Sequence, residues 1–101
     1  MEHPAILQCL KYYEHNNEIT VTYIPVDHNC TINPQHVEAA ITKTTCLITI
    51  MYANNEIGTI MPVLEIAKMS RKYNNGNIIF HTDAAQCIGK TTFQFDDCTD
   101  M

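Results

Sequence analysis

The residues best suited to chemistry follow a short apolar run near the end of the chain. Ile78, Ile79 and Phe80 form this run, and the polar stretch after it contains a carboxylate, Asp83, and an amide, Gln86. Such a run is typical of a buried strand, and ligands of open α/β sheets bind where the strands end. In a helical turn, two side chains three residues apart face the same point. The spacing equally suits a helix cap, with Asp83 at the N-cap and Gln86 at N3, so this segment alone leaves both interpretations open.

A second polar loop, residues 53–59, follows the most continuous apolar stretch of the chain, residues 45–52. If the two predicted strands are parallel, both polar segments lie at one edge of the sheet. A carboxylate there can bond a protonated ring nitrogen, and amides such as Asn55 can bond a ring hydroxyl or ketone. This set of groups suits a flat ligand rather than a bare phosphate. The sequence contains neither a glycine-rich dinucleotide motif nor a P-loop.

His81 and Asp83 are the other pair with chemical potential, as two ligands of a metal ion. Zinc and similar ions take three or four protein ligands, and the spacing of the sequence offers no third, so we expect no metal site. A histidine at the end of a buried strand is more simply a structural residue with local hydrogen bonds. The spacing supports neither a Ser-His-Asp nor a Cys-His nucleophile.

Helical and strand periodicities alternate along the chain and predict an α/β fold with mostly parallel strands. His3-Pro4 and Asn33-Pro34 each predict a helix start, and Asn74-Asn75-Gly76 predicts the end of a helix over about residues 63–73. Strands are expected over residues 19–25, 45–52 and 78–80, with one more short strand at 91–95. The continuous run at 45–52 predicts a strand covered on both faces. The apolar sides of the second and third helices are expected to be Val37, Ala40 and Ile41, and Leu64, Ile66, Ala67 and Met69.

Composition limits the size of the protein and its partners. A chain of 101 residues, 46% of them hydrophobic, is enough for one small domain. The net charge of -5, with only six scattered Lys and Arg residues, argues against a nucleic-acid or membrane partner. No long apolar segment or export leader is evident, so we expect a soluble protein. The five cysteines lack a Cys-x-x-Cys pair and are expected to be reduced intracellular thiols.

Three segments, in this order and separation, resemble the cysteine desulfurase and selenocysteine lyase family: Glu2-His3, residues 53–59 (Ala-Asn-Asn-Glu-Ile-Gly-Thr) and residues 81–90 (His-Thr-Asp-Ala-Ala-Gln-Cys-Ile-Gly-Lys). These enzymes belong to aminotransferase class V, have a fold-type I large domain and use pyridoxal 5'-phosphate. The resemblance implies that Asp83 pairs with the pyridinium nitrogen of the cofactor, while Gln86 and Asn55 bond near its phenolic oxygen. It also implies that His3 stacks on the pyridine ring and takes part in proton transfer. Without the resemblance, His3 is simply a helix cap.

The chain also departs from this family. By the resemblance, the Schiff-base lysine is expected a little beyond Met101, and the nucleophilic cysteine in a later loop, so neither has a counterpart here. Lys90 closes the Asp83 motif and is expected to point away from the predicted site. The upstream phosphate-binding turn and the small domain are also missing. We therefore interpret residues 1–101 as a single, incomplete cofactor-binding large domain, part of a three-layer α/β fold with a mostly parallel sheet and flanking helices.

The resemblance predicts that the parent protein is an enzyme, a lyase that removes selenium or sulfur from selenocysteine or cysteine and leaves alanine. Residues 50–51 and 61–63 favour the selenocysteine lyase branch. The alternatives are a cysteine desulfurase serving iron-sulfur cluster assembly, another class V aminotransferase and a non-catalytic α/β remnant. The implied partners are the amino-acid substrate and a second subunit of a homodimer. The expected location is the cytoplasm, or the mitochondrion for a desulfurase, and the 101-residue chain alone is expected to be inactive.

Overall fold

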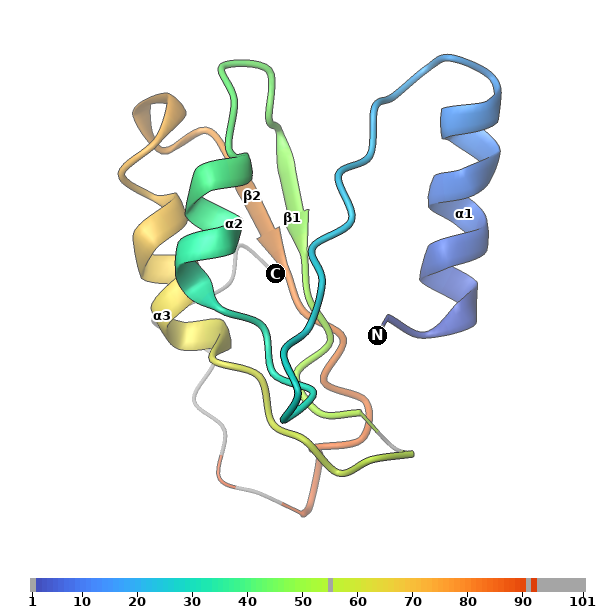
Figure 1. The fold of residues 1–101 in the computed structure, drawn as a ribbon, viewed down its shortest axis with the longest axis vertical. Helices are drawn as coiled ribbons and strands as arrows, with labels where there is room; N and C mark the ends of the chain where they lie inside the picture. Colours follow the sequence, from blue (N-terminus) through green and yellow to red (C-terminus); the bar gives the residue numbers. More distant parts are fainter. Residues whose placement is uncertain (1, 55, 91, 93–101) are drawn as a thin grey trace.

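Two parallel strands and three α-helices make up the part of the chain that this computed structural model describes, residues 2–54, 56–90 and 92. In chain order the elements are α1 (Pro4–His15), α2 (Pro34–Ala40), β1 (Leu47–Thr49), α3 (Val63–Ser70), the 3-10 helix η1 (Asn74–Gly76) and β2 (Ile79–His81) (Figure 1). The register pairs Leu47 with Ile79, Ile48 with Phe80 and Thr49 with His81. The predicted parallel pairing, with α3 in the connection between the strands, is confirmed.

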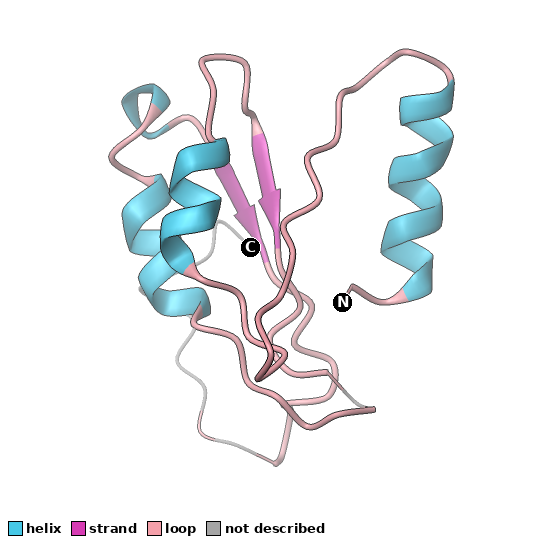
Figure 2. Cartoon of the chain, viewed as in Figure 1, coloured by secondary structure: helices cyan, strands magenta, loops and turns pink. Residues whose placement is uncertain are grey.

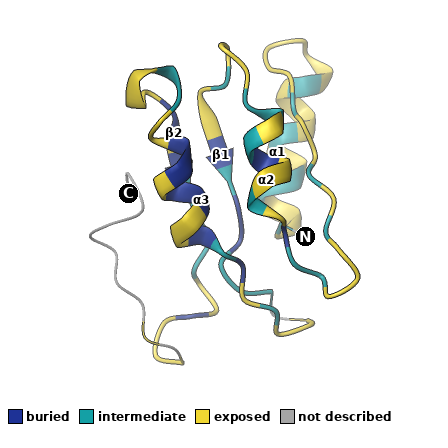
Figure 3. Ribbon diagram, turned by 60° about the vertical axis from the view of Figure 1, so that its left-hand side comes forward, coloured by how far each residue is buried: buried dark blue, intermediate teal, exposed yellow. Residues whose placement is uncertain are grey.

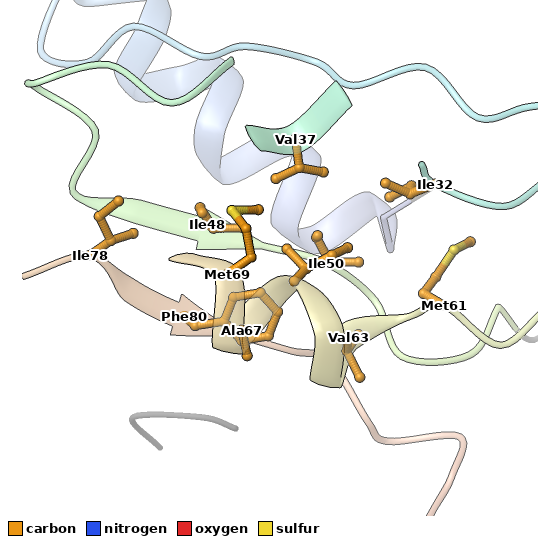
Figure 4. Packing of buried hydrophobic residues seen from close by; sticks show 11 residues of the cluster. Ile32, Val37, Ile48, Ile50, Met61, Val63, Ala67, Met69, Ile78 and Phe80 are labelled. Atoms are coloured by element: carbon orange, nitrogen blue, oxygen red, sulfur yellow. The ribbon is translucent and has the colours of Figure 1, made fainter. Parts of the chain in front are cut away.

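One face of the two strands packs against α2 and α3 to form the hydrophobic core. Phe80 of β2 and Ile66 of α3 are among the largest fully buried side chains. The cluster is drawn in Figure 4 and consists of Ile32, Val37, Ile48, Ile50, Met61, Val63, Ile66, Ala67, Met69, Ile78 and Phe80. Two of the predicted strands and two of the predicted helices therefore meet on this face of the sheet.

The opposite face of the strands is open. Leu47 and Ile79 are register partners there and remain 44% and 53% exposed. Successive side chains of a strand point to opposite faces, so burial of Ile48 and Phe80 on one side leaves these two on the other. The expectation that the 45–52 strand is covered on both faces is therefore not met by the described residues.

Helix α1 stands apart from the core. Its start is the predicted one, because the His3 side chain caps it by accepting a 3.2 Å hydrogen bond from the Ala5 N–H at Nδ1. Each of its twelve residues is exposed or half-buried. In Figure 1, α1 lies on the other side of β1 from α2 and α3. No helix within residues 2–54, 56–90 and 92 combines the length and apolarity needed to cross a membrane.

Helix α2 begins as predicted, with Pro34 in its first turn and the Asn33 Oδ1 accepting a 2.9 Å bond from the Gln35 N–H. Helix α3 ends at Ser70, earlier than the predicted Tyr73. Its chain then reverses through η1, where Asn74 and Asn75 have positive φ values of 49° and 56°. Asparagine tolerates this left-handed conformation better than most residues. The chain therefore reverses at the predicted Asn74-Asn75 pair, a short turn after the end of α3.

The buried side of α3 differs from the predicted one at three positions. Leu64 is 45% exposed, whereas Val63 and Ser70 are buried. Ser70 tolerates burial because its Oγ donates a 2.8 Å hydrogen bond to the Ala67 carbonyl, one turn earlier. The other expected core residues of this helix, Ile66, Ala67 and Met69, are confirmed.

The predicted strand over residues 19–25 is wrong: this segment is extended but belongs to no sheet among the described residues. A strand exists only through ladder bonds to a neighbour, and the segment instead bonds to a side chain of α1. The Val21 N–H and the Tyr23 hydroxyl donate to the two carboxylate oxygens of Glu14, each at 3.3 Å. Farther along, Ile24 and Val26 pack against the core cluster.

The predicted strand at 91–95 lies outside the described residues except for Thr92. The interpretation of residues 1–101 as one incomplete domain stays a prediction.

Candidate functional site

The two segments that follow β1 and β2 run side by side. Beyond the strands, the Ile50 N–H donates to the His81 carbonyl at 3.1 Å and the Tyr52 N–H donates to the Asp83 carbonyl at 2.9 Å. The Thr82 hydroxyl adds a 2.7 Å bond to the Ile50 carbonyl. These bonds hold both segments together as far as Asp83, which therefore lies at the carboxyl edge of the parallel pair, where the sequence placed it.

Asp83 is half-buried, and its Oδ1 accepts a 3.1 Å hydrogen bond from the Ala85 N–H. Residues 85–90 form successive turns rather than an α-helix, as the loop colouring of Figure 2 shows. One of these turns is closed by the Cys87 N–H, which donates to the Ala84 carbonyl at 2.8 Å. The structure therefore gives Asp83 a local turn-capping bond through one oxygen, without the helix that a capping box requires.

Gln86 and Lys90 are exposed and contact each other. The Lys90 Nζ donates a 3.3 Å hydrogen bond to the Gln86 Oε1. The expectation that Lys90 points away from the predicted site residues is therefore not met at Gln86. Because the amide oxygen is engaged, the Gln86 amide nitrogen remains the group that can donate to another molecule.

The start of the chain reaches the same edge of the sheet. The Glu2 Oε1 accepts a 2.5 Å hydrogen bond from the Met51 N–H, just beyond β1. Burial raises the pKa of the Glu2 carboxyl above its ordinary value of 4.5, and the charge of Asp83 adds to this, while the Met51 bond acts in the opposite direction. His3, the next residue, is exposed. The Glu2 bond thus places the start of the chain at the edge that Asp83 follows, while the His3 side chain caps α1.

Asn55, the fourth predicted cofactor residue, lies outside the described residues. The loop around it is held by Asn54, whose Oδ1 accepts bonds from the Glu56 N–H at 2.9 Å and the Ile57 N–H at 3.2 Å. The Gly58 N–H closes the turn on the Asn54 carbonyl at 2.9 Å, with a left-handed φ of 71° at Gly58. This loop follows β1 and so leaves from the carboxyl edge.

His81 is satisfied locally, because its Nδ1 and the Thr49 hydroxyl form a 2.8 Å hydrogen bond across the two strands. Within the described ranges, His, Cys, Asp and Glu residues form no group of three that could hold a metal ion. Cys87 is buried beside the site, and burial, together with the charge of Asp83, raises the pKa of its thiol. The four described cysteines, Cys9, Cys30, Cys46 and Cys87, are free thiols.

Glu2 belongs to the first family motif, but its residue type and position suggested no role for it. Its long-range bond to Met51 has no local sequence signal, since the two residues are 49 positions apart. The only hint is its place directly before His3 in the first motif.

Comparisons with known proteins match nearly the whole chain. A sequence profile of the family described as "Aminotransferase class-V" matches residues 1–100. The chain is 40% identical over 97 residues to cysteine desulfurase IscS of Dictyoglomus turgidum. The matched region covers 96% of this chain and 24% of that protein. It is 43% identical over 90 residues to a cysteine desulfurase of Nostoc sp., covering 89% of this chain and 22% of that protein. The chain thus spans about a quarter of the length of the curated relatives that it matches.

Solved structures agree with these relatives. A structure titled "NIFS-like protein" superposes with a TM-score of 0.88 at 37% identity, over 94% of this chain and 26% of that one. A structure titled "SspA in complex with cysteine" superposes with a TM-score of 0.86 at 38% identity, over 95% of this chain and 26% of that one. The expected fold class, an α/β part of a fold-type I large domain, and the expected cysteine desulfurase relationship are both confirmed. The chain belongs to the aminotransferase class-V family.

Proposed function

We propose that this chain is part of the large domain of a pyridoxal-phosphate enzyme that removes sulfur from cysteine and leaves alanine. The observation that carries the proposal is the edge at the carboxyl ends of two parallel strands, where Asp83 lies and where Glu2, the residue before His3, is hydrogen-bonded to Met51. The relatives named cysteine desulfurase, and a similar structure that holds cysteine, support cysteine as the substrate. Selenocysteine is the second candidate, favoured by residues 50–51 and 61–63.

The groups at this edge fit the cofactor. A half-buried carboxylate, Asp83, suits a charge-assisted hydrogen bond to a protonated ring nitrogen. The amide nitrogen of Gln86 suits the anionic phenolic oxygen, because Lys90 already engages the amide oxygen. Asn55 is predicted to bond the same oxygen. When bound, the cofactor supplies an electron sink for the substrate bond that breaks.

His3 has one ring nitrogen available for proton transfer. Its Nδ1 accepts the Ala5 N–H, so the proton of the neutral ring resides on Nε2. We therefore infer that Nε2 is the atom through which His3 exchanges a proton. The proposed role of Asp83, in contrast, is to accept a hydrogen bond from the protonated nitrogen of the cofactor ring.

The decisive experiment compares two aspartates in the full-length protein encoded by the complete transcript. Asp83→Asn keeps the shape but loses the charge, and we expect sulfide release to fall by roughly 100-fold or more, as when a preorganised electrostatic contact is lost. Asp27→Asn is the matched control, because Asp27 is the other described aspartate and its Oδ1 accepts two backbone N–H bonds at 2.9 Å within its own turn. Equal activity of the two variants would contradict the cofactor role of Asp83.

Borohydride trapping with mass spectrometry tests the remaining roles. The 101-residue chain alone should release no sulfide and form no stoichiometric cofactor adduct, since the lysine that binds the cofactor is expected elsewhere. An adduct on Lys90, whose amine already lies against Gln86, would overturn this assignment.

A complete transcript without the later lysine and cysteine would instead favour the non-catalytic remnant. We further infer that the parent is a homodimer located in the cytoplasm or, as a desulfurase, in the mitochondrion.

A further inference from the structure

We propose that Glu2 is a positioning residue, whose carboxylate fixes His3 at the strand edge that carries Asp83. The proposal rests on the proposed function, because it concerns how His3 is presented to the cofactor. It assigns a task to a residue whose side chain joins two distant parts of the chain.

The first argument is that packing does not hold the start of the chain. Every residue of α1 is exposed or half-buried, so no apolar side chain anchors this helix in the core. The 2.5 Å hydrogen bond from the Met51 N–H to the Glu2 Oε1 joins the segment before α1 to the segment that follows β1. Since His3 directly follows Glu2, this bond limits how far the imidazole can move from the strand edge.

The second argument is the burial of the other carboxylate oxygen. Glu2 Oε2 is shielded from solvent and has no hydrogen-bond partner among the described residues. A buried acceptor without a partner costs stability, so a purely structural anchor would be better served by another side chain. Glu2 also lies within electrostatic reach of Asp83 and His81. Its carboxylate therefore lies beside the strand end that carries Asp83.

The experiment measures geometry and cofactor binding separately in the full-length protein. Hydrogen exchange at the Met51 amide, followed by mass spectrometry of the cofactor-free protein, reports the Glu2 bond directly. Titration with pyridoxal phosphate, followed by absorbance, reports the apparent Kd. We expect Glu2→Ala to speed Met51 exchange and to weaken cofactor affinity about tenfold, the effect of losing one hydrogen bond to a charged group. Glu2→Gln, which retains an acceptor oxygen, should restore both.

Glu14→Ala is the matched control. Glu14 also accepts a backbone N–H, at 3.3 Å from Val21, but it lies near the other end of α1. We expect wild-type Met51 exchange and wild-type cofactor affinity in this variant. Glu2→Asp keeps the charge but shortens the side chain, so it should also lose protection at the Met51 amide. It is the milder variant to use if Glu2→Ala does not fold.

The outcomes separate the two proposals. Unchanged Met51 exchange and unchanged affinity in the Glu2→Ala and Glu2→Asp variants would overturn the role of Glu2, as would an equal loss in Glu14→Ala. If the wild-type protein binds no pyridoxal phosphate, the proposed function fails, and the positioning role for its cofactor fails with it. If the wild type, Glu2→Gln and Glu14→Ala bind the cofactor normally while Glu2→Ala and Glu2→Asp lose affinity, both proposals stand.

Discussion

Helices α3 and α1 are held in place by different forces. The eight-residue α3 buries five side chains against the strands, whereas all twelve residues of α1 remain at least partly accessible (Figure 3). Full burial of one aliphatic side chain contributes about 1.5–3 kcal/mol, while a hydrogen bond contributes about 0.5–1.5 kcal/mol net. The fold of this chain therefore depends on α3 and its neighbours, and the placement of α1 depends on a few polar contacts.

This difference bears on the candidate site, because one partner comes from each region. Asp83 follows a strand of the packed core, and His3 caps the loosely packed helix. Substitutions in the core should thus change stability, while substitutions at Glu2 should change the geometry of the site with the fold retained. The predictions below test this division, from the largest expected effect to the smallest.

Truncation of Phe80 should have the largest effect on stability. This ring is 1% exposed between β2 and α3, so Phe80→Ala leaves a cavity in the core. We expect the free energy of unfolding to fall by about 3–5 kcal/mol. The half-buried Leu10 of α1 is the matched position, and Leu10→Ala should cost less than about 1 kcal/mol. Urea denaturation of the full-length protein, followed by circular dichroism, measures both, and similar losses would refute the contrast between the helices.

The open face of the strands should control self-association of the isolated 101-residue chain. Leu47 and Ile79 form an exposed apolar pair beside two strand edges, a surface that favours aggregation. We expect light scattering to detect association, and the double variant Leu47→Lys and Ile79→Lys to reduce it. Leu64→Lys is the control, because Leu64 is exposed to a similar extent, 45%, on α3. A monodisperse wild-type chain with a cooperative thermal transition would contradict the prediction.

The smallest expected effect is a pH dependence caused by Glu2. Its pKa is raised in the folded protein, so the folded state binds this proton more tightly than the unfolded state. The resulting stabilisation is present below the ordinary pKa of 4.5 and is lost as the pH rises through the raised value. Glu2→Gln should remove this part of the pH profile of unfolding. Cys87 and Tyr73 also have raised pKa values, but their ordinary values are 9.0 and 10.0, so they act in a separate alkaline range. Superimposable profiles of wild type and variant between pH 4 and 7 would rule out the effect.

Local features were predicted well from the sequence. The His3 and Asn33 caps and the left-handed turn at Asn74 and Asn75 appear where the residue types placed them. Caps and turns involve bonds between residues a few positions apart, so short-range chemistry determines them. The position of Asp83 at the end of a strand followed in the same way from an apolar run that stops at a polar turn.

Features that depend on distant partners were predicted less well. The 19–25 segment has strand-forming residues, yet it bonds to Glu14 and joins no described sheet. Residue type could not show that Leu64 faces solvent while Ser70 is buried, because the orientation of α3 on the strands decides this.

By itself, then, the sequence determined where helices begin, where one of them must stop and which strand end bears an acid, since these depend on neighbours along the chain. Only the tertiary structure decided which face of each element is covered and that the start of the chain lies at the Asp83 edge. The physical reason is the length of the loops involved: the Glu2 bond to Met51 closes across 49 positions. Such a contact requires the fold to place the Met51 N–H within reach of Glu2, which no pattern of neighbouring residues determines.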